Sequence, residues 1–262
     1  KDFLTALTRA LLSRITSDPA RYLLPTTQVA FASLEERHMA VWTDNDNINN
    51  VFRRNGWDGG IVKVACNKTC VADYLQVVDS NFGINKSNYF LERTYSFETT
   101  LGEGRVGHKL AITYNNKSQA GVWPGGEYKN YLRLFTPFGS KAILATIINP
   151  KTGESAELAI DNEEEQGKAV FGTILTVPAG ESRQVVILWD TDNEAQNVQE
   201  RVFLWQKQAG TTNDLASLRV NIPSGTGITA IPEPTLTTAA SASYNTTLSR
   251  DLLINLTWQP KH

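Results

Sequence analysis

The segment RTYSFETTLGEGRVGHKLAITY, residues 93–114, decides the fold of this chain. Tyr95 and Phe97 alternate with polar side chains in its first half, and apolar side chains keep the same alternation from Val106 to Tyr114. A repeat of two residues is typical of a strand with one buried face and one face toward water. The sequence GEGR at residues 102–105 separates the halves and is typical of a hairpin turn. The segment therefore predicts a β-hairpin.

Short apolar segments continue along the chain after this hairpin, separated by turn sequences such as PKTG at residues 150–153. Many short strands at such spacing favour an antiparallel sandwich. A stretch rich in Pro, Thr, Ala and Ser at 232–243 predicts a long surface loop, and a linker is the alternative. The acidic run at 163–165 predicts a solvated turn. The further predicted strands are 130–136, 141–148, 156–160, 168–176, 183–189, 200–206, 216–222 and 252–258.

The first third of the chain has a mixed pattern of helical and strand segments. Its predicted elements are a helix over 2–15, a helix from Thr26 or Thr27 to Arg37, a strand over 38–42, a helix capped by Asp44 that ends at Gly56, and a strand over 74–78. We therefore predict an α+β fold. A mixed α/β segment over residues 1–88, the C-terminal part of a larger domain, precedes an antiparallel immunoglobulin-like β-sandwich domain over residues 89–262.

Composition narrows the classes of function. The net charge is −2, and the lysines and arginines are scattered, which argues against nucleic acid as a partner. The longest apolar runs, such as residues 185–189, fall far short of the roughly 20 residues of a membrane span. We therefore expect any membrane attachment to come from an anchor outside these residues. The chain starts at Lys1 without an initiator Met, so we also expect a part of the protein upstream.

The two cysteines, Cys66 and Cys70, are separated by three residues, which is not the spacing of a thioredoxin-type redox pair. We favour a local disulfide that closes a loop, and two independent thiols are the alternative. A disulfide would favour an extracytoplasmic location.

A series of segments resembles a known family. The series includes WTD at 42–44, DYLQVV at 73–78, NFGINKSNYF at 81–90, WPGGEYKNYLRL at 123–134 and TPFGS at 136–140. In this order they resemble the C-terminal half of a bacterial family catalogued as domain of unknown function 4012, over roughly residues 1–220. The resemblance implies a bacterial envelope protein whose N-terminal half is missing here, and it implies no activity.

The densest set of polar candidates for a binding site lies between residues 81 and 88. With two arginines from later segments, these side chains could bind an anion or a saccharide. The alternative is a polar loop whose amide side chains satisfy the backbone groups of turns. The candidates are Asn81, Asn85, Lys86, Asn88, Arg93 and Arg133.

Aromatic residues and histidines supply the remaining candidates. Trp123 and Tyr128 could stack on sugars or anchor a protein, or could close one end of the core. The acidic and amide residues 44–47 could hold calcium, but capping of a helix explains them more simply. His108 falls on the apolar face of its strand, which predicts a partly buried, hydrogen-bonded structural histidine.

We therefore expect no catalytic residue, metal or cofactor in this segment, although an enzyme remains an open alternative for the whole protein. The predicted function is that of a non-catalytic extracytoplasmic module at a bacterial cell surface, with a structural or adhesion role. The alternatives are an accessory domain of an enzyme that acts on cell-envelope polymers and a carbohydrate-binding module. The expected partner is a cell-surface protein or a cell-wall polymer, and self-association is a further alternative.

Overall fold

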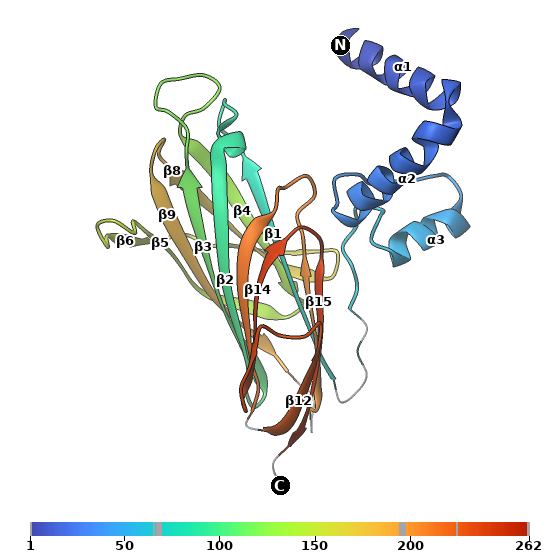
Figure 1. The fold of residues 1–262 in the computed structure, drawn as a ribbon. Helices are drawn as coiled ribbons and strands as arrows, with labels where there is room; N and C mark the ends of the chain where they lie inside the picture. Colours follow the sequence, from blue (N-terminus) through green and yellow to red (C-terminus); the bar gives the residue numbers. More distant parts are fainter. Residues whose placement is uncertain (1, 65, 67–69, 194–197, 224, 261–262) are drawn as a thin grey trace. The chain divides into compact units, whose positions relative to one another are not determined.

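The computed structural model describes residues 2–64, 66, 70–193, 198–223 and 225–260 (Figure 1). The chain divides into two compact units, residues 1–60 and 61–262. The first unit holds the three α-helices, and the second holds all the described strands. This division differs from the predicted boundary at residue 88, because the strand β1 (Cys70–Asn81) pairs with β4 (Tyr128–Pro137) and β10 (Glu200–Gln206) inside the second unit.

The helical unit consists of α1 (Asp2–Ser17), α2 (Pro19–Glu35) and α3 (Asp46–Arg54). The carboxylate of Asp18 accepts a hydrogen bond from the Arg21 amide at 3.2 Å and begins α2, with Pro19 in its first turn. Helix α2 is therefore one element, where the sequence predicted a new helix at Thr26 or Thr27.

Two further predictions for this unit are wrong. Helix α3 is capped by Asn45 and not by Asp44, because the Asn45 side-chain oxygen accepts from the amides of Asn47 and Ile48 at 3.0 and 3.3 Å. Residues 38–42 do not form a strand. Val41 donates one backbone hydrogen bond to Trp57, and no ladder forms around it among the described residues.

The second unit is built from two mixed β-sheets. The first sheet has the order β12-β15-β10-β1-β4-β8-β7, and the second has the order β13-β14-β11-β2-β3-β9-β5-β6. The strands not yet bounded are β2 (Leu91–Leu101), β3 (Arg105–Asn116), β5 (Ser140–Ile148), β6 (Ser155–Glu157), β7 (Asp161–Glu165), β8 (Lys168–Val177), β9 (Ser182–Asp192), β11 (Asp214–Asn221), β12 (Gly225–Ile231), β13 (Leu236–Thr237), β14 (Ser241–Leu248) and β15 (Leu252–Pro260).

The predicted α+β fold with an antiparallel immunoglobulin-like sandwich is wrong. Strands take up 49% of the chain and helices 19%, so the protein is mostly β. Each sheet also contains one parallel pair, β1 with β10 and β2 with β11. The strands β1 and β2 follow each other along the chain but lie in different sheets. The later strands β10 and β11 then pair with β1 and β2 in the parallel direction. Antiparallel hairpins alone cannot produce this arrangement.

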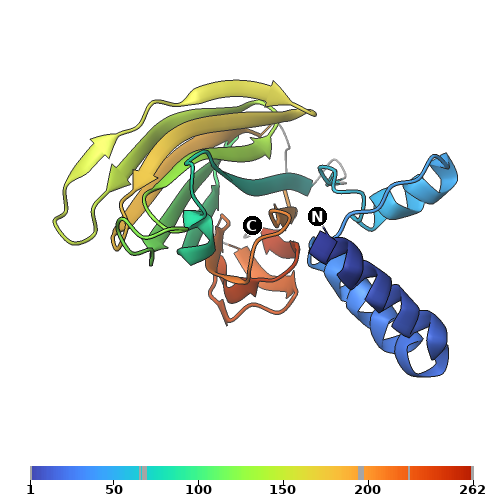
Figure 2. The same ribbon diagram turned by 90° about the horizontal axis from the view of Figure 1, so that it is seen from above.

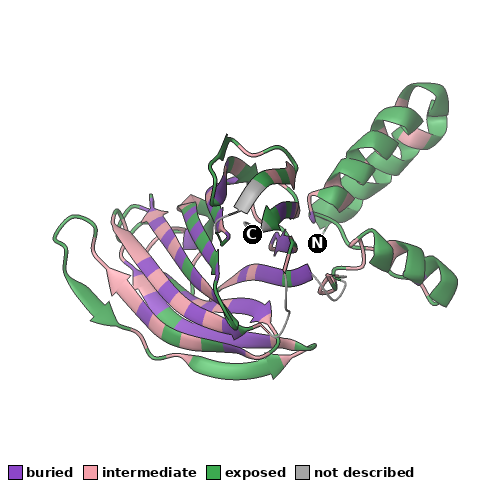
Figure 3. Ribbon diagram, turned by 90° about the horizontal axis from the view of Figure 1, so that it is seen from below, coloured by how far each residue is buried: buried purple, intermediate pink, exposed green. Residues whose placement is uncertain are grey.

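The predicted hairpin forms and lies at the centre of the second sheet. Leu101 pairs with Val106 across the turn, where Gly104 has a φ of +72° that suits glycine. The alternation of buried and exposed residues is visible along the strands in Figure 3. Phe97 and Leu110 from this hairpin pack with Leu75 and Leu132 of the first sheet, so the main core lies between the two sheets.

Two stretches expected to be irregular contain strands, and β7 and β13 are edge strands of their sheets. The acidic run at 163–165 belongs to β7, the last strand of the first sheet, and the stretch 232–243 contains β13 and the start of β14. In Figure 2 the C-terminal strands, coloured orange to red, gather at one side of the unit, away from β5 to β9. Charged residues are common on edge strands because they discourage pairing with another chain.

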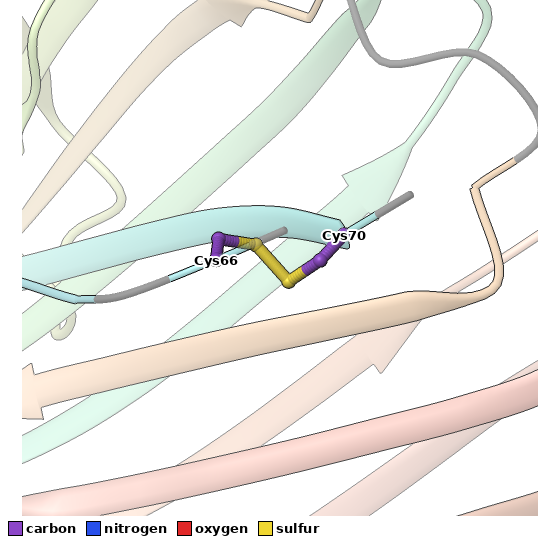
Figure 4. Close-up of a disulfide and its surroundings, with 2 residues drawn as sticks. All are labelled: Cys66 and Cys70. Carbon is purple, nitrogen blue, oxygen red and sulfur yellow. A yellow bond between two sulfur atoms is a disulfide. The ribbon is translucent and has the colours of Figure 1, made fainter. Parts of the chain in front are cut away.

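The predicted disulfide is confirmed. Cys66 and Cys70 are bonded, with their Cα atoms 5.5 Å apart, at the start of β1 (Figure 4). A structural disulfide is consistent with an oxidising, extracytoplasmic compartment. No helix among the described residues is both long and apolar enough to cross a membrane.

Candidate functional site

A polar cavity of about 590 Å³ lies at one end of the β unit. The end of β1, the starts of β2 and β4, and the segment after β10 surround it. These segments meet because β10 runs parallel to β1 while β4 runs antiparallel to it. The sheet pairing thus gathers residues that are far apart in the sequence.

The floor of the cavity is a buried ion pair between Asp79 and Arg93. Their side chains lie 2.8 Å apart, and Arg93 also contacts Asp214 at 2.9 Å. The hydroxyl of Tyr114 donates to Asp79 at 2.8 Å. The amide side chain of Gln208 bonds the backbone N–H and C=O of Asp79, both at 2.9 Å. A network with this many partners holds the floor in one geometry.

The loop at residues 81–88 forms one wall, and its asparagines hold the loop in place. The side-chain oxygen of Asn81 accepts from the Gly83 amide at 3.0 Å. The oxygen of Asn85 accepts from the Ser87 hydroxyl at 2.7 Å, and its nitrogen donates to the Glu127 carbonyl at 2.8 Å. Asn81 and Asn85 therefore stabilise the turn, as in the alternative interpretation of the sequence.

Three side chains of this wall keep polar groups available to a ligand. Asn88 accepts from Asn81 at 3.2 Å through its oxygen, and its nitrogen has no hydrogen-bond partner among the described residues. Lys86 is exposed, and 83% of Tyr89 is exposed beside the cavity. The backbone of Lys86 is fixed, because its amide donates to the Pro124 carbonyl at 2.7 Å.

The structure brings most of the predicted site residues together. Those that line the cavity are Asn81, Asn85, Lys86, Asn88, Arg93 and Tyr128. Two predicted residues are not among its lining residues. Arg133 pairs with Glu165 at 3.3 Å beside β7, and Trp123 has 72% of its surface exposed on the loop before β4. Tyr128 is 1% exposed and belongs to the main core between the two sheets, which agrees with the core alternative for this residue.

Other residues of the cavity were not predicted. Asp79 gave no signal because it follows an apolar run within a strand. Residues 208–212 gave none because they lie more than a hundred positions from the asparagine loop. Tyr89 belongs to the segment NFGINKSNYF at 81–90, which was quoted for the family resemblance. Its position directly after the loop at residues 81–88 was the only sequence signal for it.

A second charged cluster lies inside the core of the β unit. Asp73 and Arg201 form an ion pair, and Thr99 accepts from Arg201 while donating to Asp73 at 3.3 Å. Nε2 of His108 lies 3.1 Å from the Asp73 carboxylate, and the His108 ring stacks on Trp189 at 4.8 Å. Burial raises the pKa of Asp73, but the charges of His108 and Arg201 outweigh burial and hold that pKa below its ordinary value. None of its residues lines the cavity described above, and its contacts connect the strands β1, β2, β3 and β10.

No group of three or more metal-ligating side chains is placed to hold an ion within the part of the chain that the structure describes. No family model matches the chain, and no curated protein does. The resemblance to domain of unknown function 4012 therefore stays a prediction.

Several solved structures are distantly similar. A candidate nutrient binding protein from Legionella pneumophila is 10% identical, with a TM-score of 0.45 over 73% of this chain and 73% of that chain. An M1 zinc metallopeptidase from Deinococcus radiodurans is 14% identical, with a TM-score of 0.36 over 63% of this chain and 42% of that chain. Native yeast LTA4 hydrolase is 6% identical, with a TM-score of 0.41 over 66% of this chain and 29% of that chain. This chain spans less than half of the last two, and none of the three decides its function.

Proposed function

We propose that this chain is a non-catalytic module of a bacterial cell envelope that binds a carbohydrate in the cavity at the end of its β unit. The observation that carries the proposal is the rigid polar cavity. Its floor and its wall are fixed by internal hydrogen bonds, while Asn88 and Tyr89 keep polar and aromatic surface toward it.

The chemistry of this surface suits a ligand rich in hydroxyl groups. A planar amide such as that of Asn88 can donate to one sugar hydroxyl and accept from a neighbouring one. The ring of Tyr89 offers an apolar face and a polar tip, and such rings pack against the C–H faces of sugars. A preorganised site loses little conformational entropy when the ligand binds.

An adhesion role agrees with the other features of the chain. The disulfide favours an oxidising compartment, and the predicted resemblance implies a bacterial envelope protein. Cell-wall polysaccharide is the partner that such a location supplies in excess. A surface structural role without a ligand would not explain the ordered polar cavity.

A glycan array, followed by calorimetry on the glycans it finds, tests the proposal. We expect binding that weakens roughly two- to tenfold in Tyr89→Ala, the range of a single aromatic contact. Trp123→Ala is the matched control, because Trp123 is also an exposed aromatic residue but is not among the residues that line the cavity. Absence of glycan binding by the wild type, or weakening in the Trp123 variant alone, would contradict the proposal.

A further inference from the structure

Arg93, the cation at the cavity floor, is already held in ion pairs. Asp79 and Asp214 supply two negative charges, and Arg93 bonds both of them. Burial raises the pKa of Asp214, and the positive charges of Arg93 and the nearby Lys207 oppose that rise. Arg93 is thus engaged by two carboxylates, so its charge is not available to an anionic ligand.

Lys86 also lines this cavity and, unlike Arg93, is free of ion pairs with the described residues. Its ammonium group forms no ion pair with the carboxylates of the described residues. The carboxylate of Glu127, on the facing loop, is already bonded to Lys129 at 3.3 Å. The Lys86 amide donates a hydrogen bond to the Pro124 carbonyl at 2.7 Å. This bond holds the backbone from which the Lys86 side chain extends at the rim of the cavity.

We propose that the ligand of the cavity is an acidic saccharide, whose carboxylate or phosphate group is bound by the ammonium of Lys86. This inference rests on the proposed function and names the class of its ligand. The sugar hydroxyls meet Asn88 and Tyr89, while the anionic substituent points to the rim. Lys86 selects among sugars there, because a lysine donates three charged hydrogen bonds and accepts none.

Matched pairs of sugars test this inference. The pairs are oligogalacturonate with galactose oligomers, N-acetylmuramic acid with N-acetylglucosamine, and glucose 6-phosphate with glucose. We expect the wild type to bind acidic members roughly three- to tenfold tighter than neutral ones, as for one partly exposed charged hydrogen bond. The preference should shrink as salt is added. The first two pairs report a carboxylate, and the third reports a phosphate.

Lys86→Gln removes the charge while keeping a long polar side chain. It should lose the preference for acidic sugars and keep the affinity for the neutral ones. Lys151→Gln, in the turn between β5 and β6, is the control and should retain the preference. Equal binding of acidic and neutral sugars by the wild type would overturn this inference alone, as would a preference that survives in Lys86→Gln. Binding of neither class would overturn the proposed function as well.

Discussion

Removing the negative charge of Asp73 tests whether the buried cluster stabilises the β unit. Asp73 is 2% exposed and Arg201 is 1% exposed, so Asp73→Asn leaves a guanidinium in the core without its counter-charge. Breaking a buried ion pair from one side costs about 3–5 kcal/mol. Nε and Nη1 of Arg201 already lack hydrogen-bond partners among the described residues, and the neutral hydroxyl of Thr99, which accepts from Nη2, cannot replace the lost negative charge.

The assay is urea unfolding followed by tryptophan fluorescence, because Trp189 stacks on His108 within this cluster. A domain of ordinary stability, about 5–15 kcal/mol, would lose a large part of its unfolding free energy in this variant. The control is Lys141→Gln, which breaks an ion pair with Asp192 on the surface and should leave the urea midpoint unchanged.

A double variant shows whether the unpaired charge is the cause. Asp73→Asn combined with Arg201→Met removes both charges, and we expect it to be more stable than Asp73→Asn alone. A loss in Asp73→Asn no larger than about 1 kcal/mol, as for a surface pair, would refute the reasoning. So would a double variant that is less stable than both single ones.

Three further predictions concern the Asp73 cluster, the disulfide and the loop at residues 81–88. The pKa of Asp73 is lower in the folded state than its ordinary value of 3.8, so the stability that this carboxylate contributes is present above about pH 4 and is lost as the pH falls below it; acid titration of unfolding should show this slope in the wild type and not in Asp73→Asn. Replacing Cys66 and Cys70 by alanine should lower the unfolding free energy by about 2 kcal/mol, from the entropy of a short closed loop, and an unchanged urea midpoint would contradict this. Asn85→Ala removes the bond to the Glu127 carbonyl, so amide hydrogen exchange should accelerate across residues 81–88, and unchanged protection would show that the asparagine does not hold the loop.

The local part of the fold could be predicted from the sequence because it depends on neighbouring residues. The hairpin of β2 and β3 is predicted by apolar side chains that alternate with polar ones on both sides of a glycine turn. The pairing of β1 with β10 joins residues such as Cys70 and Glu200, which are about 130 positions apart, and no periodicity specifies it. Strand β14 was missed because its sequence, SASYNTTL, is mostly polar and small, although Tyr244 and Leu248 are buried.

In the candidate site too, the local part could be predicted from the sequence and the part made by long-range pairing could not. The asparagine loop was found because amides at close spacing are typical of either turns or polar sites. Of the floor, Arg93 was predicted but Asp79 and Gln208 were not, since these residues come together only when the sheets form. Arg133 was expected to join them, but the residue lies beside Glu165 of β7, a strand whose acidic sequence predicted a turn.

Chemical-shift mapping of the isotope-labelled protein during titration with soluble cell-wall glycan strands that contain N-acetylmuramic acid tests the central claim most directly. We predict that the largest amide shifts fall on residues 81–89 and 208–212, the two walls of the cavity, and that they saturate. Shifts centred on Trp123 or on the helices of residues 1–60, or no saturable shifts at all, would contradict the proposal that this cavity is a carbohydrate-binding site.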